Sequence, residues 1–156
     1  MELVAQIPFA ARMVVTNQSE IAAYARALGL VVVPSPDAAL GMGHSVAAGA
    51  QAVDKNTEGI LFINADQPFA AQNVVEELCR VFAEQDKIVV PCVEGRPSSP
   101  CIFPVRFRAK LCALTGEQGG RQVYRRHLEE TYFVEQDSIE SFTDLDYPQD
   151  YMPYQK

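Results

Sequence analysis

Residues 59–69, GILFINADQPF, contain the feature that most constrains the fold. Five of the six residues from 60 to 65 are apolar, which is typical of a strand buried on both faces of a sheet. Asp66 follows where that strand should end, and Pro68 prevents the strand from continuing. Ligands of open α/β sheets bind just beyond the carboxyl ends of the strands, so Asp66 is a candidate ligand for Mg²⁺ and, through it, for phosphates. The residues alone equally allow that Asp66 caps the next helix or fixes a turn.

Strand-like apolar runs alternate with helical patterns along the rest of the chain. The runs predict strands over residues 12–16, 30–33, 60–65, 88–92, 101–103 and 131–135. The helical spacing of apolar residues predicts helices over residues 20–28, 44–53, 71–85, 107–114 and 119–127, and a last helical turn over residues 147–151. This alternation indicates an α/β fold, a Rossmann-like and mostly parallel sheet with helices on both faces. Residues 94–100, EGRPSSP, read as a surface loop, and no linker divides residues 1–156, so we expect a single domain.

Composition excludes several classes of function. The hydrophobic content of 48% over 156 residues allows one well-packed domain. The net charge of −7 argues against nonspecific binding to nucleic acid or to an anionic membrane, because both need a basic surface. No apolar run approaches the ~20 residues of a membrane span. The first residues lack the basic start and long apolar core of a signal peptide, so we expect a cytoplasmic location.

The cysteines do not indicate a metal or redox centre. Cys79, Cys92, Cys101 and Cys112 form no CxxC pair, and no histidine lies at metal-ligand spacing from them. Each stands beside apolar residues, so we expect buried, reduced thiols.

Three further segments carry residues that could bind a ligand. In residues 41–49, GMGHSVAAG, His44 and Ser45 stand at the start of a predicted helix, whose free N–H groups suit a phosphate or a polar base edge. The alternative is that one of them is an N-terminal cap. Residues 114–121, LTGEQGGR, form a Gly-rich turn ending in a cation, or else an ordinary connection between helices.

The last segment, residues 142–151, has the sequence FTDLDYPQDY. Asp144 and Asp146 alternate, so in an extended segment only one of them can face Asp66. The alternative is that Asp146 or Tyr147, before Pro148, starts the last helix.

The order of the strings GMGHSVAAG, ADQPF, RPSSPCIF, LTGEQGGR and DLDYPQDY resembles that of the molybdenum cofactor cytidylyltransferase group. This group belongs to the MobA-like nucleotidyltransferases, within the sugar-nucleotide transferase fold, and the resemblance covers residues 12–151. It implies transfer of CMP or GMP from a nucleoside triphosphate to a molybdopterin-like acceptor, with release of pyrophosphate and with Mg²⁺ bridging the phosphates. CTP is favoured over GTP as the donor.

The resemblance also implies roles for individual residues. Asp66 would be the catalytic residue, binding both nucleotide and metal, with Asp144 or Asp146 as a second metal ligand. Met42 and Ser45 would line the nucleotide pocket. The acceptor would be faced by Arg96, Ser99, Thr115, Gly116 and Arg121.

The chain also departs from this group. The group opens with a strand, a Gly-rich loop that wraps the triphosphate, and a Lys, and residues 1–12 contain none of these, so we expect an N-terminally incomplete domain. The missing strand would leave two neighbouring strands with unpaired edges or force them to pair directly, and a homodimer could cover such an edge. Ser98 and Ser99 precede Pro100 where the group has a His, Glu117 replaces an Asp, and Tyr147 replaces a Thr. The alternative function is therefore a non-catalytic nucleotide- or pterin-binding, regulatory homologue.

Overall fold

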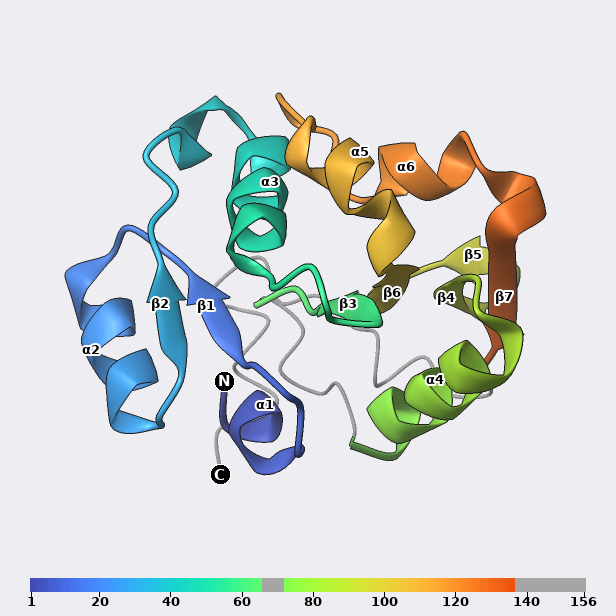
Figure 1. Cartoon of the computed structure of the whole chain (residues 1–156), viewed down its shortest axis with the longest axis horizontal. Coiled ribbons are helices and arrows are strands. Elements are labelled where there is room, and N and C mark those ends of the chain that lie inside the picture. Colours follow the sequence, from blue (N-terminus) through green and yellow to red (C-terminus); the bar gives the residue numbers. More distant parts are fainter. Residues whose placement is uncertain (66–71, 137–156) are drawn as a thin grey trace.

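The computed structural model describes residues 1–65 and 72–136, which form two β-sheets surrounded by helices (Figure 1). The first part contains α1 (Glu2–Gln6), β1 (Met13–Val15), α2 (Ser19–Ala27), β2 (Val31–Val33), α3 (Met42–Ala52) and β3 (Gly59–Phe62). The second contains α4 (Gln72–Gln85), β4 (Ile88–Val93), β5 (Arg96–Pro97), β6 (Cys101–Pro104), α5 (Arg108–Cys112), α6 (Arg121–Arg125) and β7 (Thr131–Glu135). Short 3₁₀ turns span Ala38–Leu40, Val105–Phe107 and Leu128–Glu130.

The predicted strands and helices within the described residues are present, with ends displaced by a few residues. The strand predicted over residues 60–65 already ends at Phe62. The helical turn predicted over residues 147–151 lies outside the described residues. None of the described helices is long and apolar enough to cross a membrane.

The prediction of a mostly parallel sheet is wrong for the larger sheet, which is mixed. Its strands lie in the order β3, β6, β4 and β7, with β5 as a short hairpin extension on β4. β6 runs antiparallel to both β3 and β4, whereas β4 and β7 are parallel. Among the described residues, β1 pairs in parallel with β2 and β4 with β7, whereas the other three strand pairs are antiparallel.

The physical reason for the reversal lies in the segment predicted to be a loop. Glu94 and Gly95 both have positive φ angles, 52° and 72°, and connect Val93 to Arg96, which are paired across the hairpin. Two successive residues with positive φ are the signature of the tight turn that joins antiparallel strands. The chain therefore turns back on β4 through β5 and enters β6 antiparallel to it.

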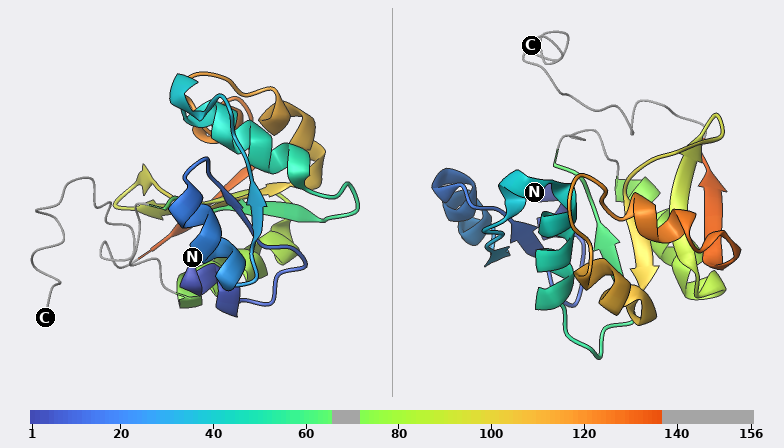
Figure 2. Two further views of the ribbon diagram at one scale, coloured as in Figure 1. Left: turned by 90° about the vertical axis from the view of Figure 1, so that its left-hand side faces the viewer. Right: turned by 90° about the horizontal axis from the view of Figure 1, so that it is seen from above.

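Helices cover both faces of the larger sheet, as predicted (Figure 2). Because side chains alternate along a strand, Ile88 and Val90 of β4 face one side and Val89 faces the other. The first side packs against α3, α5 and α6 through Ala50, Leu111, Val123 and Tyr124. The second packs against α4 through Val74, Leu78 and Val81. All four cysteines are free thiols, with Cys92 buried and the others partly buried.

The smaller sheet stands beside the larger one without pairing with it. Within the described residues, β1 pairs only with β2 and β3 pairs only with β6. Of the two outcomes expected for these strands, direct pairing between β1 and β3 is therefore absent from the described residues. α3 packs against both β1 and β2 and so connects the two sheets.

Replacement of Phe103 by Ala should reduce the free energy of unfolding by about 3–5 kcal/mol. Phe103 is fully buried in β6 and its ring lies edge-on to Phe62, at a centroid distance of 6.0 Å, so truncation leaves a cavity in the core. Denaturation in urea, followed by circular dichroism, measures the change. Leu40→Ala is the control, because Leu40 is 62% exposed and its truncation should change stability little.

Candidate functional site

A pocket of about 610 Å³ lies where α3, β3, β6 and α6 meet. The start of α3 contributes Met42 and Val46, and the end of β3 contributes Phe62 and Asn64. Residues 97–99 and β6 form a second wall, with Cys101 and Phe103. The remaining lining residues are Glu117, Gln118, Gly119, Gly120, Arg121, Gln122, Tyr124 and Arg125. Segments far apart in the sequence thus converge on one pocket.

The first wall forms because two Gly-rich segments pack backbone against backbone. The Gly43 N–H donates to the Gly116 carbonyl oxygen at 2.8 Å. A Cβ on Gly41 would lie 2.3 Å from the Gly116 carbonyl carbon, and one on Gly43 would lie 2.7 Å from the Thr115 carbonyl oxygen. Gly41 also has a φ of 124°, which side-chain-bearing residues rarely adopt. Any side chain at these positions would therefore separate α3 from the turn.

The opposite wall joins the end of β3 to the segment before β6. The Asn64 N–H donates to Ser99 Oγ at 3.4 Å, and Cys101 Sγ donates to the Ser98 carbonyl oxygen at 3.2 Å. These contacts place the chain just before the predicted DQP turn against the SSP segment. The polar groups of Asn64, Ser98 and Ser99 line the pocket together.

The pocket has a cationic side in an otherwise acidic protein. Arg121 and Arg125 lie four residues apart on α6 and both line the pocket, while Glu117 supplies the only carboxylate among the described lining residues. Neither arginine forms an ion pair with another described residue. Like charges at this spacing repel each other on a helix, and an anion bound between them would relieve that repulsion. The arrangement suits a phosphate or carboxylate group.

The pocket's two titratable neutral groups stay protonated at neutral pH. Burial raises the pKa of the Cys101 thiol to about 12, partly offset by the nearby Arg121. Burial also raises the pKa of the Tyr124 hydroxyl, and Cys101 adds to that rise whereas Arg121 opposes it. A buried thiol with a raised pKa is a poor nucleophile, so the pocket is not suited to cysteine-based chemistry.

The sequence-predicted site residues fall into three groups. Met42, Ser99 and Arg121 line the pocket. The predicted residues that do not line it are Ser45, Arg96, Thr115 and Gly116, although the backbone of the last two packs against the start of α3. Asp66, Asp144 and Asp146 lie outside the described residues.

The proposed capping role of His44 or Ser45 is wrong. The helix starts at Met42 and its N-cap is Gly41, which makes no side-chain cap hydrogen bond. Both side chains therefore lie inside the first turns of α3 rather than at its cap.

Sequence reasoning missed several pocket residues, namely Asn64, Gln118, Gln122, Tyr124 and Arg125. Arg125 carried a usable signal, since it stands one helical turn after Arg121 and so shares its face. Asn64 is the single polar residue in the apolar run of residues 60–65, which also sets it apart. The glutamines and Tyr124 carry no comparable sequence signal.

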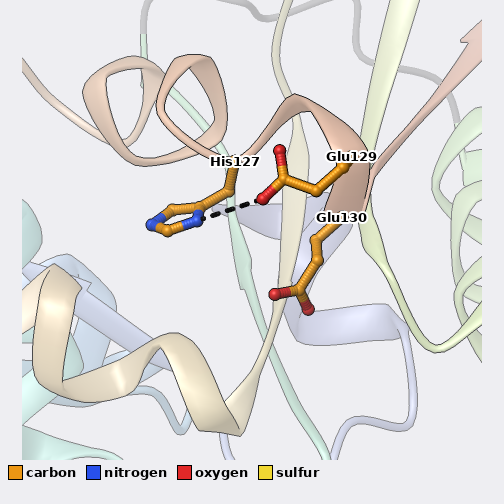
Figure 3. A group of neighbouring side chains, drawn as sticks. All are labelled: His127, Glu129 and Glu130. Carbon is orange, nitrogen blue, oxygen red and sulfur yellow. Dashed lines mark ion pairs between the residues drawn. The ribbon is translucent and has the colours of Figure 1, made fainter.

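The described pocket residues do not by themselves make a metal site, because one carboxylate and two arginines favour anions over cations. A separate group, His127, Glu129 and Glu130, brings ligand atoms within 4.8 Å of one another (Figure 3). Arg106 Nε already contacts Glu130 Oε2 at 3.2 Å, and Lys110 Nζ lies 2.8 Å from His127 Nε2. Two cationic side chains thus already contact this group, and we assign no metal to it.

Comparison with known proteins identifies the family. Residues 1–131 match the MobA-like NTP transferase domain. The chain belongs to this family of nucleotidyltransferases. No curated protein sequence matches it.

Several solved structures share the fold of this MobA-like chain. Rv0371c from Mycobacterium tuberculosis H37Rv, solved in complex with manganese, is 19% identical with a TM-score of 0.78, over 97% of this chain and 81% of that one. The 4-diphosphocytidyl-2C-methyl-D-erythritol synthase from Anaerococcus prevotii DSM 20548 is 12% identical with a TM-score of 0.74, over 96% and 79%. The CMP:2-keto-3-deoxy-manno-octonic acid synthetase complexed with CTP is 10% identical with a TM-score of 0.68, over 95% and 80%.

Replacement of Gly43 by Ala should separate α3 from the 115–117 turn and reduce the free energy of unfolding by about 1–3 kcal/mol. The added methyl group would collide with the Thr115 carbonyl and strain the Gly43–Gly116 hydrogen bond. Urea denaturation measures the loss, and the exchange rate of the residue 43 amide hydrogen should rise. Gln51→Ala, an exposed change in the same helix, should leave both quantities unaltered. Equal stability of the Gly43→Ala protein would contradict this account of the wall.

Proposed function

We propose that this MobA-like chain transfers CMP or GMP from a nucleoside triphosphate to a molybdopterin-like acceptor, and that CTP is the preferred donor. The observation that carries the proposal is the convergence of the GMGHS, SSP and GEQGGR segments, which bear the resemblance, on one pocket. Two arginines line this pocket and form no ion pair with another described residue. In the reaction, a phosphate oxygen of the acceptor bonds to the α-phosphorus of the nucleoside triphosphate. The bond between this α-phosphorus and the pyrophosphate oxygen breaks, and pyrophosphate leaves.

The two walls of the pocket would bind different parts of the substrates. Met42 and the start of α3 would contact the nucleotide, and Arg121 and Arg125 would hold the acceptor's phosphate and offset its negative charge. Because Tyr124 and Cys101 keep their protons, they would act only as hydrogen-bond donors or packing groups. Catalysis would thus rest on positioning and electrostatics.

We propose a divalent metal, Mg²⁺, as cofactor, held by Asp66 with Asp144 or Asp146. The support is the acid-rich sequence pattern and the solved manganese complex of Rv0371c, a protein of the same fold. A bound Mg²⁺ neutralises charge on the phosphates.

The second candidate is a homologue that binds the nucleotide or pterin without catalysis. The observation that supports it is the pocket itself, because Arg121 and Arg125 suit a bound phosphate whether or not transfer follows. The two candidates differ in turnover. Release of pyrophosphate from CTP and molybdopterin with Mg²⁺ supports the transferase, whereas saturable CTP binding without release supports the binding protein. Absence of CTP, GTP and pterin binding by calorimetry would contradict both.

Replacement of Asp66 by Asn should weaken Mg²⁺-dependent CTP binding by about tenfold or more, or about 1.4 kcal/mol, because it removes a charged metal ligand. Calorimetry with and without Mg²⁺ measures the loss, and the free energy of unfolding should stay close to that of the unmodified protein. A protein that unfolds but still binds CTP would assign Asp66 a structural role instead.

Replacement of Arg121 and Arg125 together by Ala should weaken binding of the phosphorylated acceptor by about tenfold or more, because two charge-assisted contacts are lost. Binding of CTP should change much less. Arg126→Ala is the matched control, since Arg126 is an exposed neighbour that does not line the pocket. If the control and the double variant lose acceptor affinity equally, the loss follows from the change in net charge and not from contacts in the pocket.

A further inference from the structure

Tyr124 is a buried pocket residue whose hydroxyl group donates to no described residue. It is only 4% exposed and yet lines the pocket. Its backbone carbonyl accepts from Thr131 Oγ1, but among the described residues no group accepts its O–H. The exposed Tyr24, by contrast, donates its hydroxyl hydrogen to Glu2 Oε1 at 2.6 Å. Buried tyrosine hydroxyls usually have a partner, so this unused donor in a pocket indicates a ligand.

The described side chains near this hydroxyl are poor acceptors. Burial raises its pKa and nearby Cys101 adds to the rise, whereas Arg121 and Arg125 oppose it, so all three lie close to the group. Guanidinium groups only donate, and a thiol sulfur accepts weakly. The Cys101 thiol itself donates to a backbone carbonyl oxygen at 3.2 Å. The proton of Tyr124 is therefore available to an acceptor that enters the pocket.

Contacts with β7 hold Tyr124 in place. Its ring lies edge-on to Phe133 of β7, at a centroid distance of 6.3 Å and an interplanar angle of 90°. Thr131 Oγ1, at the start of β7, lies 3.4 Å from the Tyr124 carbonyl oxygen and 2.8 Å from that of His127. Because ring and backbone are both held, a ligand need not order this donor when it binds.

The spacing on α6 places three donors beside one another. Residues three and four apart are neighbours on a helix, so Arg121 lies beside both Tyr124 and Arg125. All three residues line the pocket. A phosphomonoester presents three terminal oxygens, all of which accept hydrogen bonds. A carboxylate or a phosphodiester presents only two such oxygens, so three donors match a phosphomonoester best.

We propose that the Tyr124 hydroxyl donates a third hydrogen bond to a phosphomonoester held by Arg121 and Arg125, and that it makes the pocket select phosphomonoesters over phosphodiesters and carboxylates. The hydroxyl binds as a donor and transfers no proton. This inference rests on the proposed function, since the same arginines would hold the acceptor's phosphate. It adds Tyr124 as a specificity-determining residue and requires that this phosphate be singly esterified.

The test compares phenyl phosphate, a monoester, with methyl phenyl phosphate, a diester, by calorimetry on the full chain. At about pH 8 the monoester carries two charges, and Tyr124 keeps its proton because burial raises its pKa. The unmodified chain should bind the monoester saturably and more tightly than the diester. Tyr124→Phe should weaken monoester binding about tenfold or more and diester binding much less, because the diester's two terminal oxygens already face the arginines.

Tyr132→Phe is the matched control, since it removes the same atom from a tyrosine of β7 that is 41% exposed and does not line the pocket. It should bind both probes as the unmodified chain does. Tyr124→Phe keeps the ring that contacts Phe133, so its free energy of unfolding should change little. Absence of monoester binding by the unmodified chain, or unchanged monoester binding by Tyr124→Phe, would overturn the proposal. Equal weakening of both probes would assign Tyr124 a structural role and also overturn it.

The outcome can be told apart from that of the transferase proposal, because neither probe contains a nucleotide and their binding needs no release of pyrophosphate. Monoester selectivity that depends on Tyr124, in a protein that releases no pyrophosphate from CTP, would support the role of the hydroxyl and contradict transfer alone. Release of pyrophosphate together with unchanged monoester binding by Tyr124→Phe would overturn the role of the hydroxyl alone.

Discussion

The insertion of β6 between β3 and β4 is the interaction on which the rest of this structure depends. Ile102 of β6 packs into the cluster under α4, and Phe103 packs into the cluster under α3, α5 and α6. β6 also carries Cys101 to the pocket wall and Phe103 against Gly120. One antiparallel strand therefore joins both layers of the core and supports the pocket, and the tight turn at Glu94 and Gly95 makes its direction possible.

The pocket owes its shape to small residues and its chemistry to a few charged ones. Gly41, Gly43 and Gly116 let α3 and a turn meet backbone to backbone, so the start of the helix forms part of the wall. Arg121 and Arg125 then set the preference for anions, because the groups around them are mostly neutral. The pocket lies in a domain of the MobA-like NTP transferase family.

α3 connects the pocket with both sheets. Its first turn contacts the 115–117 turn, and Gly49, two turns later, lies over Val15 and Phe62. The same helix therefore contributes Met42 to the pocket wall and packs over side chains of both sheets.

The sequence by itself determined most of the strands and helices, because the apolar period is a local property. For example, residues 131–135 were predicted as a strand and form β7 with the same bounds. Its ordered motifs also indicated the family to which the chain belongs. Only the tertiary structure decided the strand directions, since the turn at Glu94 and Gly95 reads as a loop until its backbone angles are known. It likewise decided that Arg125 and Asn64 share a pocket with Met42 whereas Arg96 does not, because that depends on contacts between distant segments and not on local spacing.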